Sequence, residues 1–255
     1  MALSQRSRFI FAGAFFYVFF LLGWLPAEVV ARLVAERSND TVFLVDPKGT
    51  AWDGSAASVV VISPTDQVSI GGIRWHARLD RLVRGELAAV LHAADGSRTL
   101  VATTPTSIAF EDTSITLPAS IIAVIVPALS IWRPAGELKL DTAHFTVGND
   151  GTDGQATLLW QHAGTSLSRV QPLGDYSVSI NGKKSATRFT VSTLSGPLEV
   201  SGQGVWRNRN DWQFNGQARA TRAKRAALDD LLKLFSRAKD GDKYLLQFSS
   251  AGANK

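Results

Sequence analysis

The residue types that most often carry out chemistry are sparse in this sequence, and their spacing fits no catalytic or metal site. The histidines lack the HExxH spacing that places two imidazoles on one helix face for a metal. They stand singly, as His76, His92, His144 and His162. His76 and His162 each closely follow a tryptophan, and we expect both on strands. The lack of cysteine excludes thiolate catalysis, disulfide bonds and cysteine-bound metals.

Two short motifs suggest sites, but both lack the partners that the chemistry needs. Residues 236–239 (SRAK) match the S-x-x-K pattern of a serine nucleophile, without the SDN and KTG motifs that accompany it. Residues 149–154 (NDGTDG) suggest a calcium loop, yet Trp160 stands at position twelve, where a bidentate glutamate is needed. We interpret this stretch as a turn. The sequence predicts no enzyme, no metal, no cofactor and no small-molecule substrate.

The chain is basic, with a formal net charge of +5 and a pI near 9.7. Its lysines and arginines are scattered, with one modest cluster at residues 219–225. Nucleic-acid binding needs a basic patch or stripe, so we do not expect it. Anionic lipid headgroups or acidic proteins fit this charge better.

Residues 9–25 (FIFAGAFFYVFFLLGWL) carry no charge and follow Arg6 and Arg8. At about 1.5 Å per residue, the run is close to the length that spans a hydrocarbon core of about 30 Å. A cleaved secretory signal is the alternative, but the LPA tripeptide at residues 25–27 lacks the small residues that cleavage needs. The run therefore predicts an uncleaved transmembrane helix.

A large polar region follows this single span, which favours an N-terminus in the cytoplasm and a domain outside it. Arginines flank both ends of the span, so the positive-inside rule adds little bias. We expect a cytoplasmic tail at residues 1–8, an anchor with an amphipathic helical extension at residues 9–37, and a β domain at residues 41–250.

Apolar and polar residues alternate in many short runs after residue 41, as in antiparallel sheets with one solvated face. The run from Tyr176 to Ile180 alternates with serines. Asn181-Gly182 follows it and predicts a hairpin turn, because both residues tolerate positive φ. Asp95-Gly96 predicts another turn.

Two segments interrupt the β pattern. Residues 119–132 are apolar, but Pro127 breaks them and they are too short for a second span, which predicts a buried element on the sheet. Apolar residues at i, i+3, i+4 and i+7 predict an amphipathic helix that caps one end of the sheet. These residues are Leu228, Leu231, Leu232 and Phe235. Residues 243–248 are predicted as a final strand.

A weak internal similarity divides the β domain. Trp75 and Trp160 each precede a linking segment, a Gly-acidic dipeptide and a hairpin. Chance similarity between β segments is an equally good explanation. If the repeat is genuine, two copies at residues 41–132 and 133–250 extend one sheet.

Six tryptophans lie outside the predicted span, and they admit two interpretations. They are Trp52, Trp75, Trp132, Trp160, Trp206 and Trp212. In the first, they fill a core between sheet and helices. In the second, the sheet is open and curved, and its concave apolar face holds a lipid tail or a partner strand.

The order of short motifs resembles that of the type II secretion system protein N (general secretion pathway protein N) family. After the phenylalanine-rich span, the matching motifs are GTAWDG (49–54), IRW (73–75), GEL (85–87), PAGEL (134–138), PLGDY (172–176), TLSGPL (193–198) and GQGVW (202–206). The similarity covers nearly the whole chain. Eight motif residues form our candidate partner surface: Trp52, Gly54, Trp75, Trp160, Gly174, Tyr176, Gly196 and Trp206.

The resemblance implies a single-pass accessory component of the bacterial inner membrane, with residues 41–250 in the periplasm. It implies contacts with other inner-membrane components, such as the protein C, L and M subunits, and with the outer-membrane secretin, and it supplies no catalytic residue. An exposed strand edge that accepts a partner strand would suit such contacts. The G-T-x-W-x-G motif also occurs in AsmA-like proteins, so a membrane-anchored lipid-binding or lipid-transfer domain is the alternative.

Overall fold

The computed structural model describes residues 17, 20–63, 66–125, 127–208, 211–236 and 238–250. The predicted tail at residues 1–8 and most of the predicted span at residues 9–25 lie outside them. No helix within the described residues is long and apolar enough to cross a membrane.

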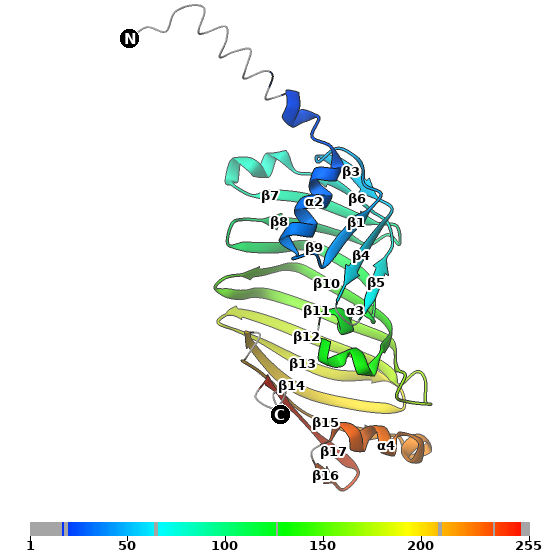
Figure 1. Ribbon diagram of the computed structural model, residues 1–255. Coiled ribbons are helices and arrows are strands. Elements are labelled where there is room, and N and C mark those ends of the chain that lie inside the picture. Colours follow the sequence, from blue (N-terminus) through cyan, green and yellow to red (C-terminus); the bar gives the residue numbers. More distant parts are fainter. Residues whose placement is uncertain are drawn as a thin grey trace, which may run out of the picture.

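Most described residues belong to β-strands, with a few short helices between them (Figure 1). The strands are β1 (Val42–Val45), β2 (Lys48–Gly49), β3 (Asp53–Ala56), β4 (Ser58–Ile62), β5 (Gln67–Ile70), β6 (Ile73–Ala77), β7 (Leu87–Ala93), β8 (Arg98–Thr103), β9 (Ser107–Pro118), β10 (Pro134–Gly148), β11 (Gly151–Thr165), β12 (Gly174–Lys184), β13 (Ala186–Ser195), β14 (Leu198–Asn208), β15 (Asp211–Ala220), β16 (Ala238–Asp240) and β17 (Lys243–Ser249). The helices are α2 (Ala27–Arg37), η1 (Leu79–Arg84), α3 (Ile121–Ile125), η2 (Pro127–Trp132), η3 (Arg222–Lys224) and α4 (Arg225–Phe235).

Fourteen of the described strands form one long antiparallel sheet, in the order β16-β17-β15-β14-β13-β12-β11-β10-β9-β8-β7-β6-β3-β2. From β6 to β15, each strand pairs with the next one along the chain. Most of the connections are short, but η1 lies between β6 and β7, and α3 and η2 lie between β9 and β10. Strands β1, β4 and β5 form a second, small sheet. The predictions of a mainly β fold, antiparallel pairing and few short helices are confirmed.

The two faces of the long sheet differ in polarity. On β12, Tyr176, Val178 and Ile180 share one face with the covering helices, whereas Ser177 and Ser179 lie on the other. We call the first the inner face and the second the outer face. Alternation along each strand produces this difference, because successive side chains point to opposite faces.

Three groups of elements cover parts of the inner face. Helix α2 packs against β1, β2 and β3, and its Ala27 is fully buried beside Trp75. Helix α3 shares a core with the small sheet and with Leu138 on β10. This confirms that residues 119–132 include a buried element.

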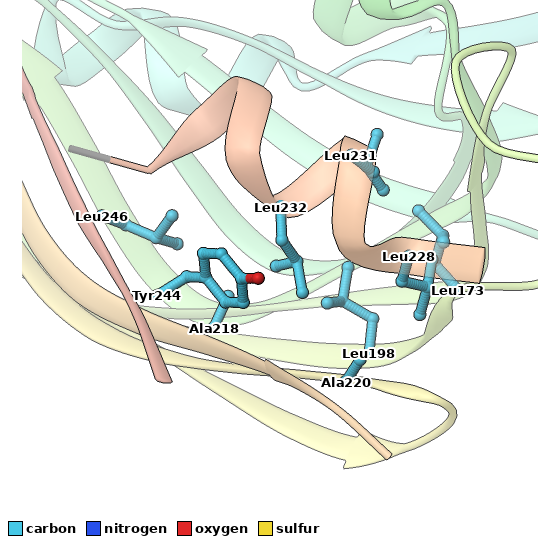
Figure 2. Packing of buried hydrophobic residues seen from close by; sticks show 9 residues of the cluster. All are labelled: Leu173, Leu198, Ala218, Ala220, Leu228, Leu231, Leu232, Tyr244 and Leu246. Carbon is cyan, nitrogen blue, oxygen red and sulfur yellow. The ribbon is translucent and has the colours of Figure 1, made fainter. Parts of the chain in front are cut away.

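Helix α4 covers the far end of the sheet (Figure 2). Its Leu228, Leu231 and Leu232 are buried together with Leu198 and Tyr244, which confirms the predicted amphipathic helix. The Tyr244 hydroxyl also donates a hydrogen bond to the Asp229 carboxylate, which ties the helix to β17. Strand β17 itself confirms the predicted final strand.

Both predicted hairpins are present, but only one turn lies at the predicted residues. Asp95-Gly96 does join β7 to β8, as expected. The hairpin predicted after Ile180 is also present, because β12 and β13 pair antiparallel, but Asn181 and Gly182 lie within β12, and Gly182 pairs with Thr187. The turn lies two residues later, where Lys184 takes the positive φ. Continued pairing of β12 with β11 and β13 outweighs the local preference of Asn-Gly for a turn.

Candidate functional site

Three of the predicted surface residues join the N-terminal segment to the first strands. The Trp52 indole N–H donates to the Leu22 carbonyl at 2.7 Å, and the Trp75 indole N–H donates to the Thr50 carbonyl at 3.2 Å. The Trp75 ring lies against Gly54, where an added Cβ would stand only 2.4 Å from a ring carbon. Gly54 of the GTAWDG motif therefore leaves room for the buried Trp75 indole. Trp52 of the same motif binds the backbone at Leu22, so the motif fixes the N-terminal segment to the sheet.

Trp160 and Tyr176 form a second group, on two neighbouring strands near the middle of the long sheet. They are cross-strand partners on β11 and β12, with ring centroids 6.1 Å apart. The Trp160 indole donates to the Ala135 carbonyl and the Tyr176 hydroxyl to the Leu198 carbonyl, each at 2.9 Å. Burial, with a smaller effect of the Asp175 charge, raises the pKa of Tyr176 above its ordinary value. This hydroxyl is therefore a structural donor.

Gly174 and Gly196 lie beside this group because two backbone segments pass very close to each other. A Cβ on Gly196 would stand 2.2 Å from the Gly174 Cα, so neither position has room for a side chain. Next to them, the Ser195 hydroxyl and the His162 backbone N–H donate to the Asp175 carboxylate. These hydrogen bonds hold the pKa of Asp175 below its ordinary value.

The predicted candidate surface is therefore not one surface. Trp52, Gly54 and Trp75 belong to the β2, β3 and β6 end of the sheet, whereas the group around Trp160 belongs to β11 and β12. Trp206 lies apart from both, exposed near the end of β14. Most of these residues fix backbone segments or pack in the core, so the family motifs chiefly mark the fold.

A strip of the inner face between α3, η2 and α4 presents apolar side chains that are only half-buried. We call it the apolar trough, and its members are Leu140, Leu158, Val178, Ile180, Phe189, Val191, Phe214 and Phe248. Cross-strand pairing makes the strip continuous, because Leu158 pairs with both Leu140 and Val178, and Val178 pairs with Val191. The trough is a continuous apolar strip that could receive a partner, and its two ends pack against the cores around α3 and α4.

Aromatic rings line the part of the trough nearest α4. Phe189 and Phe214 stack with centroids 5.9 Å apart, and Phe214 and Phe248 stack at 6.3 Å. Glycines stand opposite these rings, so the rings lie directly over backbone at Gly202, Gly204 and Gly216. None of these phenylalanines was among the residues predicted for the partner surface. The sequence feature that could have indicated them is the presence of glycines on the strands next to these phenylalanines, which leaves room for the rings.

The polar groups of the described residues form no reaction centre. His76 and His162 lie on strands, as expected, and both are exposed. No three acidic or histidine side chains of the described residues are grouped to hold a metal. A polar depression of about 500 Å³ lies near Ser195 and the ion pair of Glu199 with Arg219, whose atoms are 2.5 Å apart. It contains no histidine, and it opens to solvent.

The two edges of the long sheet differ. At one edge, β2 and β3 pack against α2, and Thr50 bridges to Pro26. At the other, β16 pairs only with residues 243–245 of β17. Among the described residues, positions 246–249 of β17 therefore have a strand partner, β15, on one side only. This is an open edge of the kind expected from the sequence.

Comparison with known proteins identifies the family. The model of the type II secretion system (T2SS) protein N family matches residues 40–247. No curated protein and no solved structure matches the chain.

Proposed function

The chain belongs to the type II secretion system protein N family, and we propose that it is a single-pass accessory component of that system in the bacterial inner membrane. The observation that carries this proposal is the family match over most of the chain. Family membership implies association with other components of the secretion system. The apolar run at residues 9–25 supports a membrane anchor with a cytoplasmic N-terminus and a periplasmic β domain. In this proposal, the β domain at residues 41–250 is either one unit or two repeated halves, at 41–132 and 133–250.

The open edge of β17 is the surface that we assign to a partner protein. Backbone groups at positions 246–249 can pair with a strand of another inner-membrane component, such as protein C, L or M, or of the secretin. Main-chain hydrogen bonds would give affinity, and side chains on alternate positions would give specificity. The protein would then act by positioning its partners, without catalysis of its own.

Photo-crosslinking of the full-length chain in the cell envelope tests this proposal. A photoreactive residue at Gln247 probes the open edge, and one at Ser179 probes the centre of the outer face; both side chains are exposed. Trp75 and Tyr176 are unsuitable positions because both are buried. We expect adducts with secretion subunits from Gln247 and none from Ser179. Recovery of no secretion subunit from Gln247 would contradict the assigned surface.

The apolar trough supports a second candidate function, the binding of an acyl chain. The trough extends from β10 to β17, six strand-to-strand steps that would cover about 29 Å in a flat sheet at about 4.8 Å each. One acyl chain spans about half of the roughly 30 Å core of a bilayer. The side chains of the strip are only partly buried, and the strip is long enough to receive one such chain.

A photoreactive phospholipid distinguishes this second function from ordinary lipid contact around an anchor. Adducts that map to β12, β13 and β14 would indicate a chain in the trough. Val178→Asp places a charge in the trough and is expected to abolish those adducts. Ser179→Asp, on the outer face of the same strand, is the matched control and is expected to retain them. Adducts confined to residues near the anchor would exclude lipid binding in the trough.

A further inference from the structure

The link between β6 and β7, with the first residue of β7, carries a group of exposed apolar side chains, among them the most exposed large apolar side chain of the described β domain. Val83 on η1 is 91 % exposed, and Leu79 and Leu87 are each more than half exposed. Leu82, on the same turn of chain, is also exposed. Clusters of exposed apolar side chains on one short element mark a contact with a membrane or another protein.

A short series of hydrogen bonds places this link beside the segment that leads to the predicted anchor. The Trp52 indole donates to the Leu22 carbonyl, and the Ala51 N–H donates to the Leu25 carbonyl at 2.7 Å. The Trp52 carbonyl then accepts from the Ala77 N–H, also at 2.7 Å, two residues before η1 begins. In Figure 1, η1 is the teal helix at the end of the sheet where the N-terminal segment leaves.

Charged contacts hold η1 in a fixed position on the sheet. The Arg81 guanidinium contacts the Glu86 and Glu111 carboxylates at 3.2 and 3.0 Å, which connects η1 to β9. Arg78 pairs with Asp80 at 2.9 Å. Arg81 is therefore directed back to the sheet, and Leu82 and Val83 are directed to solvent on the turn beside it.

The surroundings of η1 fit the interface of a bilayer. Arg84 is exposed at the C-terminal end of η1, where it can reach anionic headgroups. Trp24, near the C-terminal end of the predicted span, is also largely exposed and stacks with Phe20 at 6.0 Å. Tryptophan is enriched at the headgroup level of membranes. Apolar tips with an adjacent arginine are typical of interfacial contacts.

We propose that η1 and Leu87 insert into the headgroup region of the membrane leaflet that faces the β domain. The occupant of this surface is thus the phospholipid bilayer itself, and the inference rests on the membrane anchor of the proposed function. Two contacts, the anchor and η1, then fix the orientation of the sheet on the membrane. The β2–β7 end lies at the bilayer, and the open edge of β17 lies at the opposite end of the sheet, away from it.

The chain has no cysteine, so a thiol-reactive fluorophore labels only the cysteine that is introduced. Val83→Cys in the full-length chain is labelled with an environment-sensitive fluorophore, and Ser179→Cys on the outer face is the control. Both proteins are reconstituted in vesicles of phosphatidylcholine with phosphatidylglycerol, with and without lipids that carry a quencher at headgroup depth. We expect a blue-shifted, quenched emission from position 83 and a water-like, unquenched emission from position 179.

Flotation of the vesicles separates failure of this inference from failure of the anchor. A chain that floats with the vesicles, while the label at position 83 stays water-like, would overturn the contact and leave the anchor intact. A blue shift without quenching would indicate that protein, such as a second copy of this chain, covers η1, and it would also overturn the inference. A chain that does not float would contradict the anchor, and with it this inference. Leu87→Cys is the second probe, with the same expected result as position 83.

Discussion

Trp132, at the end of η2, and Phe248, on β17, lie with ring centroids 6.5 Å apart. Trp132 stands two residues before β10, and the order β10-β11-β12-β13-β14-β15-β17 puts six strand-to-strand steps between the two elements. In a flat sheet, six steps cover about 29 Å. The sheet must therefore curve strongly over the apolar trough, and this aromatic contact connects the two sides of the curve.

Trp132→Ala should loosen this curve and lower the free energy of unfolding. The side chain is half-buried, so we expect a loss of about 2 kcal/mol, below the 3–5 kcal/mol typical of a fully buried tryptophan. Ile131→Ala is the matched control, because its side chain is 73 % exposed, and should change little. Urea unfolding of the full-length chain in detergent measures both. Equal effects of the two substitutions would contradict a bracing role for Trp132.

Leu232→Ala should be the more damaging of two leucine substitutions on α4. Leu232 packs with Tyr244 and Leu198 (Figure 2). It is 3 % exposed, whereas Leu234 on the same helix is 65 % exposed. Removal of a buried leucine side chain typically costs about 2–5 kcal/mol through lost burial and a residual cavity. Leu234→Ala should stay within about 0.5 kcal/mol. The same urea experiment compares them, and a large effect at Leu234 would argue that another surface covers it.

Gly54→Ala should destabilise the junction between the N-terminal segment and the sheet. The new Cβ would stand 2.4 Å from a Trp75 ring carbon and 2.7 Å from the Thr50 carbonyl oxygen, so the indole must move. Overpacking of this kind costs about 1–3 kcal/mol. A Cβ on Gly71 meets nothing within 4 Å, which makes Gly71→Ala the control. Unchanged unfolding midpoints for both variants would show that Trp75 can shift without cost.

The sequence predicted those features of the fold that depend on local patterns. Period-two alternation identified the strand of Tyr176, helical spacing identified α4, and the apolar run with Pro127 identified the region of α3 and η2. These patterns suffice because each one records which side of a single element faces the core.

Features that depend on pairing across several strands were not predictable in this way. Asn181-Gly182 has the composition of a turn, but its neighbours β11 and β13 extend far enough to keep it in a strand. The trough likewise arises because registers bring Val178 opposite Val191 and Phe214 opposite Phe248. No local pattern specifies registers over seven strands, so the candidate site appears only in the structure.

Tyr176→Phe should weaken the protein by about 1–2 kcal/mol near neutral pH. The hydroxyl is buried and donates to the Leu198 carbonyl at 2.9 Å, so its removal leaves that buried acceptor without this hydrogen bond. The substitution keeps the ring and its contact with Trp160, which separates the hydrogen bond from packing.

The effect of this hydroxyl should also depend on pH. Burial raises the pKa of Tyr176 in the folded chain, whereas the unfolded phenol ionises near its ordinary value of about 10. A raised folded pKa contributes stability that is complete below about pH 10 and is lost as pH rises further, because only the unfolded state then releases its proton readily. In urea unfolding between pH 8 and pH 11, the wild type should therefore keep its advantage over Tyr176→Phe up to about pH 10 and lose it above that pH. A constant difference over that interval would mean that the hydroxyl ionises as easily in the folded chain as in the unfolded one.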